Sequence, residues 1–303
     1  MDYLKEFENY LRYERQLAES SACQYLTMLV EFKKFLMADL TRPQQFNIVS
    51  RTDVLEFLSY LRNDKKINNS TISNYIAALR SYYKWATYTT KNETLTPLLH
   101  YLVNIVRIKK PHVVPFVPTL EEITRLRDTL RAYLELSSYD KMRATYKKIL
   151  TAYTMIELLI TTGMRSNELR NLQYKDVDLE NKVIFISHGK GGHQRYSIFG
   201  DGAVNLFKEY FKIFEFQPND YIFPIKHPKH INSIVKRWAA RAKISTKLHT
   251  HSFRHFFITE SENRGIPLQI IADQVGHFSL NSTKHYTHLN IQKVRNHYNN
   301  KEI

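Results

Sequence analysis

The sequence contains one cysteine, Cys23. A single thiol cannot close a disulfide within the chain or build a zinc site from cysteines, so both are excluded as sources of stability. No segment approaches the roughly 18 uninterrupted apolar residues that a membrane-spanning helix needs. The first residues, MDYLKEFENYLRYERQL, are charged from the second position onward and lack the apolar core of a signal peptide. We therefore expect a protein of a reducing compartment, most simply the cytoplasm, with no membrane partner.

Acidic residues are scarce relative to basic ones. The chain has 44 Lys and Arg against 29 Asp and Glu, a formal net charge of +15 at pH 7, and both halves are basic. Each phosphate that a cation neutralises releases condensed counterions, so this excess favours a polyanionic partner, with nucleic acid the leading candidate. A generally basic protein with solvated lysines is the alternative.

Length and composition predict two globular domains. A chain of 303 residues with 43% hydrophobic side chains is long enough to bury two cores and too apolar to be disordered. Residues 1–107 show apolar side chains at helical spacing almost throughout. Residues that favour the first turn of a helix mark the expected starts: Ser20 with Ser21, Thr52 with Asp53 and Glu56, Asn69 with Ser70, and Thr96 with Pro97.

Val106–Pro118 separates the two halves. This segment, VRIKKPHVVPFVP, is rich in proline and has no clear periodicity, which is typical of a linker. We predict a helical domain at residues 1–111, the linker at 112–118 and a second domain at 119–303. Thr119 and Glu122 form a capping-box pattern, which predicts the first helix of the second domain.

The second domain is expected to combine helices with a small hairpin. Lys148–Thr161 is apolar nearly all round, which predicts a buried central helix that Gly163 ends. Between Val183 and Phe199, two strand-like runs flank His188–Gly192, where glycines suit a tight turn. The fold class is therefore mainly α, with a small β component (α+β). Further helices are predicted at about residues 202–214, 231–242, 252–263, 267–275 and 290–299.

Three short pieces of this domain carry side chains suited to phosphodiester chemistry. They are TGMRSNEL with Arg165, HSFRH with His251 and Arg254, and GHFSLNSTKHYTHL with His277 and Tyr286. Attack on a phosphodiester needs positive charge on the non-bridging oxygens, a nucleophile, and a proton for the departing oxygen. Arginine suits the first task because its planar guanidinium donates parallel hydrogen bonds and stays charged.

Tyr286 is the expected nucleophile. A free phenol has a pKa of about 10, so a nucleophilic tyrosine needs cationic neighbours that stabilise the phenolate. The two arginines and two histidines would supply that charge. The alternative for Tyr286 is a packing or surface role, which is the default for any one of the 20 tyrosines.

Lys190 and Glu168 are expected to support the reaction. Lys190 lies near the tip of the predicted hairpin, from which a flexible lysine can follow and protonate the leaving oxygen; a solvated turn lysine is the alternative. Glu168 stands three residues after Arg165 and could hold that guanidinium or a neighbouring basic group. An ordinary surface ion pair has the same spacing.

Metal binding is the rival interpretation of the histidines. His251 and His255 stand four positions apart and His249 is near, but no acidic or cysteine third ligand follows at a familiar interval. We expect neither a metal nor another cofactor.

Two helix faces are expected to contact a nucleic acid, with solvated faces as the alternative. The helix that starts near Ser70 carries small and then basic side chains on its polar face, with Ser73, Arg80 and Lys84 as candidates. The helix that starts near Ile231 carries a basic strip, with candidates Lys236, Arg237 and Arg241.

In this order, the R, K, HxxR, GH and Y pieces resemble the active site of the tyrosine recombinases. The segment YLRYERQLAESSACQYLTMLVEFKKFL before DVLEFLSYLR is similar to the helical, SAM-like core-binding domain of Xer-type recombinases and phage-type integrases. The remainder, from about residue 116, is similar to their mixed α/β catalytic domain. The resemblance implies a site-specific DNA recombinase in which Tyr286 forms a 3′-phosphotyrosyl bond, Lys190 is the general acid, and no nucleotide cofactor is required.

The resemblance also implies an assembly on double-stranded DNA at the nucleoid. The family works as a tetramer on two duplexes, here a homotetramer or a heterotetramer with a related recombinase. The helix after Tyr286 would dock into a neighbouring protomer, and packing onto its own domain is the alternative. Chromosome-dimer resolution and integration or excision of a mobile element remain open.

Two other functions use similar parts. A type IB topoisomerase has nearly the same active-site residues, although the helical N-terminal half argues against the compact viral type, whose corresponding domain is rich in β-structure. An architectural DNA-binding protein could keep the fold without cleaving.

Overall fold

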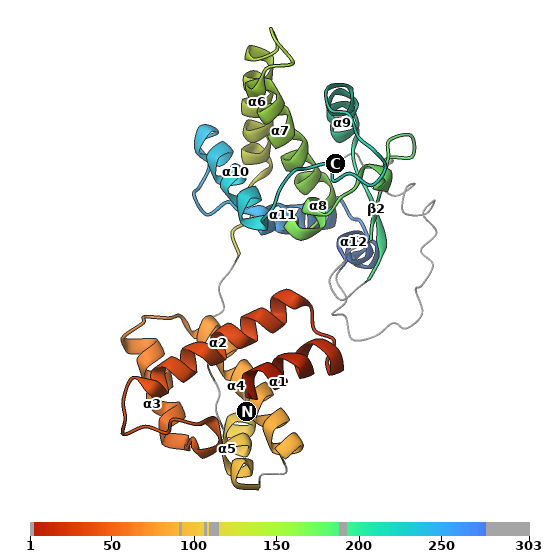
Figure 1. The fold of residues 1–303 in the computed structure, drawn as a ribbon. Coiled ribbons are helices and arrows are strands. Elements are labelled where there is room, and N and C mark those ends of the chain that lie inside the picture. Colours follow the sequence, from red (N-terminus) through yellow and green to blue (C-terminus); the bar gives the residue numbers. More distant parts are fainter. Residues whose placement is uncertain (1–2, 91–92, 106–107, 109–114, 188–192, 277–303) are drawn as a thin grey trace. The chain divides into compact units, whose positions relative to one another are not determined.

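A computed structural model describes residues 3–90, 93–105, 108, 115–187 and 193–276. The chain divides into two compact units, Met1–Val113 and Val114–Ile303, shown in sequence colours in Figure 1. The predicted domain limits and linker stay predictions. Some predicted features lie outside the described residues: Lys190, His277, Tyr286, the turn His188–Gly192 and the terminal helix at 290–299.

All regular elements among the described residues of the first unit are helices or helical turns. Its elements are α1 (Tyr3–Asn9), the π-helical turn η1 (Tyr10–Glu14), α2 (Glu19–Met37), the 3-10 turn η2 (Phe46–Ile48), α3 (Arg51–Asn63), α4 (Asn69–Thr90), the 3-10 turn η3 (Glu93–Leu95), α5 (Thr96–His100) and η4 (Tyr101–Ile105). Aromatic rings fill its core: Phe7 lies against Tyr82 and Trp85, with ring centroids 5.3 and 5.4 Å away. Offset and edge contacts of this kind add to the free energy gained by burying the rings.

The start of α3 lies two residues earlier than predicted. We expected Thr52 to cap this helix, but Ser50 is the N-cap: its side chain accepts from the Asp53 backbone N–H, and the Asp53 carboxylate accepts from the Ser50 N–H. Ser50 and Asp53 form the reciprocal capping box, for which a serine and an acid three residues apart suffice. The predicted capping box of Thr119 and Glu122, which opens α6 (Leu120–Leu136), is confirmed.

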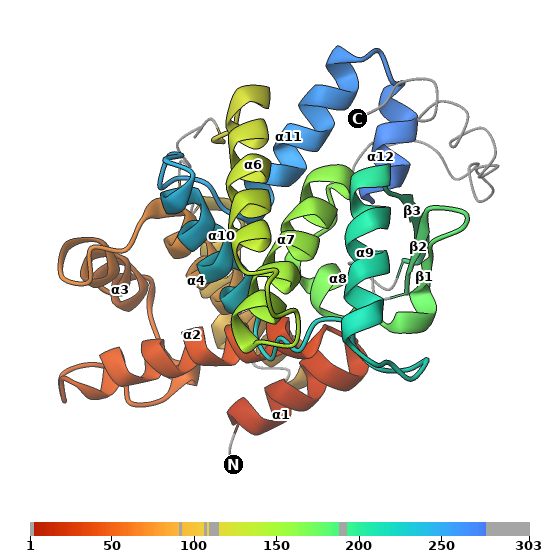
Figure 2. The same ribbon diagram turned by 90° about the horizontal axis from the view of Figure 1, so that it is seen from above.

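The second unit surrounds one buried helix, α7 (Ala144–Thr162). Every residue of α7 from Ala152 to Thr162 is buried, because several helices and a strand pack against it. Figure 2 shows α6 and α9 (Asp201–Ile213) running alongside α7. The remaining helices are α8 (Ser166–Arg170), α10 (Pro228–Arg241), α11 (Thr250–Asn263) and α12 (Leu268–Val275). The predicted central helix is thus confirmed, and the helices predicted at 202–214, 231–242, 252–263 and 267–275 correspond to α9 to α12.

A small antiparallel sheet lies beside these helices. The predicted pair of strands is present as β2 (Val183–Ile186) and β3 (Arg195–Ile198), with Val183 opposite Ile198 and Ile186 opposite Arg195. A third strand, β1 (Val177–Asp178), follows the 3-10 turn η5 (Tyr174–Asp176) and pairs with β2. We did not predict β1, because two residues are too few to show an alternating pattern.

Two helices of this unit end at glycines in the left-handed conformation. Gly163 ends α7 with a φ of 61°, and Gly276 ends α12 with a φ of 68°. Only glycine adopts this region without steric cost. Phe257 and Val275 pack tightly against Gly163, and a Cβ added to Gly163 would lie 2.9 Å from Phe257 Cδ1. The end of α7 therefore needs both the backbone freedom and the small size of glycine.

Substitution of Gly163 by alanine should lower the free energy of unfolding by about 3 kcal/mol, since left-handed strain and a clash with Phe257 add together. Gly200, the N-cap of α9, has a φ of −82° that alanine adopts easily. Gly200→Ala should therefore cost no more than about 1 kcal/mol. Urea unfolding of both variants measures the difference, and equal effects would contradict this account of Gly163.

Candidate active site

The described candidates for phosphodiester chemistry converge where α7 ends. Arg165 is the N-cap of α8, immediately after the Gly163 turn, and Glu168 lies in the first turn of that helix. His251 and Arg254 lie in the first turns of α11, whose other face buries Phe253, Phe256 and Phe257 in the core. Four of the predicted site residues thus lie in one region, while Lys190, His277 and Tyr286 fall outside the described residues.

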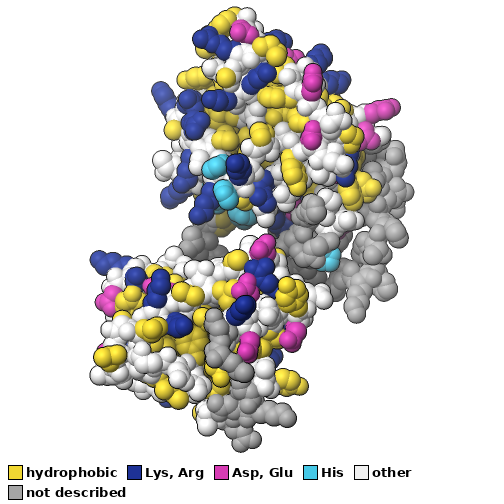
Figure 3. Space-filling model, in the orientation of Figure 1, with side chains coloured by type: hydrophobic (Ala, Val, Ile, Leu, Met, Phe, Trp, Pro, Cys, Tyr) yellow, Lys and Arg dark blue, Asp and Glu magenta, His cyan; other side chains and the backbone are white. Residues whose placement is uncertain are grey.

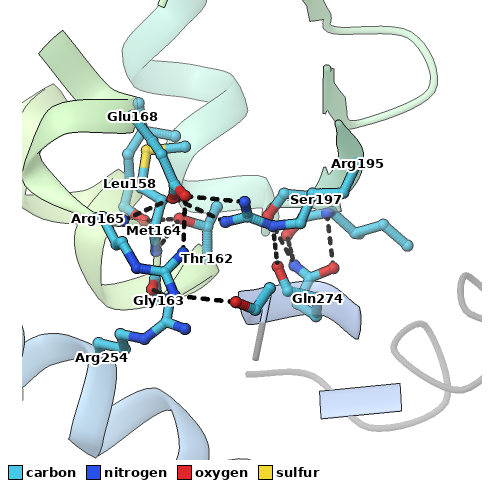
Figure 4. A network of polar contacts seen from close by, with 12 residues as sticks. Leu158, Thr162, Gly163, Met164, Arg165, Glu168, Arg195, Ser197, Arg254 and Gln274 are labelled. Atoms are coloured by element: carbon cyan, nitrogen blue, oxygen red, sulfur yellow. Dashed lines mark hydrogen bonds and ion pairs between the residues drawn. The ribbon is translucent and has the colours of Figure 1, made fainter. Parts of the chain in front are cut away.

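The Glu168 carboxylate is shared by two arginines (Figure 4). Its Oε1 accepts from Arg165 Nη1 and Arg195 Nη1, each at 2.9 Å. Its Oε2 accepts from Arg195 Nη2 and from the Arg165 backbone N–H, each at 2.8 Å. Four hydrogen bonds to one buried carboxylate satisfy its acceptor positions, which is the condition for burying a charge at tolerable cost.

The environment keeps Glu168 ionised. Burial alone would raise the pKa of its carboxyl group, but the hydrogen bond and charge of Arg195, followed by those of Arg165, outweigh burial and leave the pKa below its ordinary value. Glu168 is therefore an anion at neutral pH. Its two guanidinium partners are held in place by charge-assisted hydrogen bonds, which are stronger than neutral ones.

Arg165 also contacts the end of α12. Its Nη2 donates to the Gly276 carbonyl at 2.9 Å. A carbonyl at a helix C-terminus carries partial negative charge, so it attracts a cation. Arg165 is thus fixed on two sides, yet its side chain remains 21% exposed, so an anion from outside can reach it.

Arg254 is a buried cation with unmet hydrogen-bonding capacity. Its Nη1 donates to the Gly163 carbonyl at 2.9 Å, but its buried Nη2 has no partner among the described residues. Burial, and next the positive charge of Arg165, lower the pKa of Arg254 to about 9, which still leaves it charged at pH 7. A buried charge left partly unsatisfied is costly, so an anion that completes its hydrogen bonds would be bound strongly.

His251 stands at the edge of this cluster, where it keeps an exposed face. Desolvation, then the neighbouring His249, Arg254, His255 and Arg165, lower the pKa of His251 below its ordinary value. Its imidazole is therefore neutral at pH 7, the form that accepts a proton. This is the state that a general base requires.

The metal-binding interpretation of these histidines gains no support. The Nδ1 atom of His249 already lies 2.7 Å from Ser252 Oγ and 3.0 Å from the Lys247 carbonyl, as part of the cap of α11. Among the residues that the structure describes, no group of three or more His, Cys, Asp or Glu side chains is placed to hold a metal ion.

Sequence reasoning missed Arg195 and Gln274. Arg195 lies at the start of β3, 27 positions from Glu168, and Gln274 lies in α12. The Gln274 side chain accepts from the Ile198 backbone N–H at 3.1 Å and donates to the Ile198 carbonyl at 2.7 Å, as a neighbouring strand would. No local spacing could have revealed either residue, since both act across the fold.

The predicted basic strip of α10 is exposed. Figure 3 shows Lys and Arg side chains gathered on the part of the second unit where α10 lies. Lys236 and Arg237 are exposed, as predicted for residues that contact a ligand. Arg241 is also exposed, but its guanidinium carbon lies 4.8 Å from the Trp238 ring centroid and 5.5 Å from that of Tyr133. Arg241 therefore packs onto the protein as well as facing solvent.

The predicted DNA-contact strip on α4 of the first unit is less exposed than the strip on α10. Ser73 and Arg80 of α4 are half-buried, and Arg80 Nε donates to the Leu102 carbonyl. Lys84 is exposed. Arg80 thus has a structural contact within its own unit, which sequence periodicity could not indicate.

Comparison with known proteins agrees with the geometry. Residues 126–293 match the phage integrase family, and residues 4–89 match the N-terminal SAM-like domain of phage integrases. The chain belongs to the phage integrase family. The predicted fold class, a helical SAM-like domain followed by a mixed catalytic domain with a small sheet, is confirmed by these matches and by the elements described above.

Members of this family resemble the chain over nearly its whole length. The tyrosine recombinase XerC of Staphylococcus haemolyticus is 29% identical over 314 residues, covering 97% of this chain and 94% of the relative. Among solved structures, the XerH site-specific recombinase bound to a palindromic difH substrate aligns with a TM-score of 0.66 at 21% identity, covering 99% of this chain and 82% of that one. A lambda integrase tetramer bound to a Holliday junction aligns with a TM-score of 0.62 at 14% identity, covering 95% and 79%.

His251 should titrate below its ordinary pKa of about 6.5 in the protein without a ligand, because desolvation and nearby positive charge favour the neutral imidazole. The unfolded chain then takes up this proton first as pH falls. His251 therefore lowers the free energy of unfolding from about pH 6.5 downward, until the folded form is protonated too. NMR titration of the ring protons, assigned with His251→Gln, measures the pKa. A value at or above about 6.5 would contradict this assignment.

Arg241→Gln should lower the free energy of unfolding by about 1 kcal/mol, because the guanidinium loses its contacts with Trp238 and Tyr133. Lys236→Gln is the matched control on the same helix, where the side chain is exposed, and should change it by less than about 0.5 kcal/mol. Chemical denaturation compares the two variants. If the two variants were equally stable, the stacked Arg241 guanidinium would contribute nothing to the free energy of unfolding.

Proposed function

We propose that this chain is a site-specific DNA recombinase that cuts and rejoins DNA through a phosphotyrosyl intermediate. Membership of the phage integrase family and likeness to XerC tyrosine recombinases support this function. The observation that carries it is Arg254, a buried guanidinium whose Nη2 has no partner among the described residues and which lies beside the partly exposed Arg165. Figure 4 shows the two guanidinium groups close together.

The charge of the cluster suits a phosphodiester. Arg165, Arg195 and Arg254 are three cations against the single anion Glu168, so the described cluster is positive and lies partly out of water. A phosphodiester is a monoanion whose two non-bridging oxygens each accept hydrogen bonds. Arg254 Nη2 and the open donors of Arg165 can bind them, and the same donors stabilise the charge that builds up during attack.

The proposed cleavage step follows from these roles. The Tyr286 hydroxyl oxygen attacks phosphorus, its proton passes to the neutral imidazole of His251, and a bond forms between the phenolic oxygen and the 3′ phosphate. The bond from phosphorus to the 5′ oxygen breaks, and Lys190 donates a proton to that oxygen. His277 completes the set of groups around the phosphate. Rejoining is the reverse reaction with a 5′ hydroxyl of a partner strand, and it needs no nucleotide cofactor because the phosphotyrosyl bond retains the energy of the phosphodiester.

The substrate and the assembly follow from the family. XerH is bound to a difH substrate, and lambda integrase forms a tetramer on a Holliday junction. We infer that this chain likewise acts on double-stranded recombination sites as a tetramer, alone or with a related recombinase. Lys236, Arg237, Arg241 and Lys84 are exposed basic residues that can contact phosphates; Ser73 and Arg80 are the less accessible candidates.

We place this activity in the cytoplasm, at the nucleoid. No helix in the described part of the chain has the length and apolar character needed to cross a membrane. Resolution of chromosome dimers and movement of a mobile element both require the same chemistry. The recombination site would decide between them.

A nicked duplex that loses its short 5′ product after cleavage should trap the chain as a covalent adduct, because the 5′ hydroxyl needed for rejoining diffuses away. We expect an adduct that survives denaturant, measured by gel shift, and none with Tyr286→Phe. Arg254→Gln should slow adduct formation by about 100-fold or more, as expected for loss of a donor to the transition state.

Other outcomes would overturn parts of this proposal. An adduct with Tyr286→Phe would show that another nucleophile acts. Relaxation of supercoiled DNA without exchange between two duplexes would instead favour a type IB topoisomerase. Tight binding with no adduct from the wild type would favour a non-cleaving architectural protein.

A further inference from the structure

Arg195 is the main partner of Glu168, although no sequence pattern pointed to it. Its side chain is only 8% exposed. Nη1 and Nη2 both donate to the Glu168 carboxylate, at 2.9 and 2.8 Å, and Nε donates to the Gln274 carbonyl at 3.0 Å. All three nitrogens are thus engaged inside the protein. This guanidinium is not oriented to bind a ligand from outside.

The two arginines make different contacts with the Glu168 carboxylate. Arg195 makes a bidentate contact that spans both oxygens, whereas the Arg165 side chain reaches only Oε1, through Nη1. A buried carboxylate that lost Arg195 would leave acceptor positions unsatisfied, at considerable cost. Arg165 already donates to Oε1 and can fill them, and a bidentate contact with Glu168 would draw its guanidinium away from the exposed side of the cluster.

Arg195 also supports the backbone that Arg165 contacts. A Cβ added to Gly276 would lie 3.0 Å from Arg195 Nη1, so the two residues are in close contact, and the Gly276 carbonyl accepts from Arg165 Nη2. Through Nε and the Gln274 carbonyl, Arg195 holds the last turn of α12 against β3. Arg165 therefore depends on Arg195 at both of its anchors.

We propose that Arg195 is a positioning residue, which satisfies Glu168 and holds Gly276 so that the Arg165 guanidinium stays available to the scissile phosphate. This inference rests on the proposed recombinase function. It assigns no contact with DNA to Arg195 itself. It predicts that the effect of removing Arg195 depends on the presence of the Glu168 carboxylate.

A double-mutant cycle on the full chain tests this dependence. The variants are Arg195→Gln, Glu168→Gln and the combination of the two. The cleavage rate constant is measured on the nicked duplex at saturating protein, and the dissociation constant for the same DNA is measured separately. Arg195→Gln should cleave about 100-fold more slowly, as for a small misplacement of a catalytic group, with little change in the dissociation constant. In the Glu168→Gln background, adding Arg195→Gln should cost less than about tenfold, because the two residues act as one unit.

The Arg127–Glu157 pair provides a matched control. Arg127 Nε and Nη2 make a bidentate contact with the buried Glu157 carboxylate at 2.9 and 2.8 Å, joining α6 to α7 in the same unit. Arg127→Gln removes the same kind of contact from a buried carboxylate other than Glu168. This variant should keep the wild-type cleavage rate constant under conditions in which circular dichroism shows it to be folded.

Each other outcome overturns the inference. Cleavage by Arg195→Gln at the wild-type rate would show that Arg165 does not need it. Equal losses in both Glu168 backgrounds together with weaker DNA binding would make Arg195 a direct DNA contact. An equal loss of cleavage rate in Arg127→Gln would show that Arg195→Gln acts only by lowering the stability of the fold.

A crystal structure of Arg195→Gln gives a measurement that does not require cleavage. We expect both Nη atoms of Arg165 on the Glu168 carboxylate in that variant, and an unchanged Arg165 would overturn the inference. If the wild type forms no adduct, the recombinase proposal fails by itself, and this structural comparison still decides whether Arg195 positions Arg165.

Discussion

A buried carboxylate that two guanidinium groups share holds the candidate active site together. Removing a carboxylate from water costs several kcal/mol, and only well-aligned, charge-assisted hydrogen bonds offset that cost. Glu168 receives them from α8 and β3, and its partners in turn contact the end of α12. Three elements far apart in the sequence are thereby brought to one point. The remaining positive charge of the cluster then lies where α7 ends.

The sequence predicted those site residues whose relations are local. Arg165 with Glu168 and His251 with Arg254 are each three positions apart, a spacing that places side chains on one helix face. The spacing also predicted that Glu168 holds either Arg165 or a neighbouring basic group, and it holds both Arg165 and Arg195. It could not identify that second group, because the pairing depends on how β3 packs against α8 and α12.

The same limit applies to helix ends and surfaces. The cap at Thr119 was predicted correctly, whereas Ser50, two residues before the predicted Thr52, caps α3, because several residues near a helix start can accept the same hydrogen bond. Periodicity placed Arg80 and Arg241 on polar faces. It could not show that Arg80 donates to a backbone carbonyl or that Arg241 lies over two aromatic rings. A helical pattern identifies a face but not the atoms that meet it.

The two glycine-ended helices give the candidate site a particular tolerance of sequence change. Arg254 donates to the carbonyl of Gly163 and Arg165 to the carbonyl of Gly276, so main-chain oxygens at two helix C-termini orient both guanidinium groups. A main-chain acceptor is present whatever side chains surround it. Other side chains around these turns can therefore change while both guanidinium groups keep their directions, provided that each turn retains its left-handed glycine and Glu168 keeps its two arginine partners.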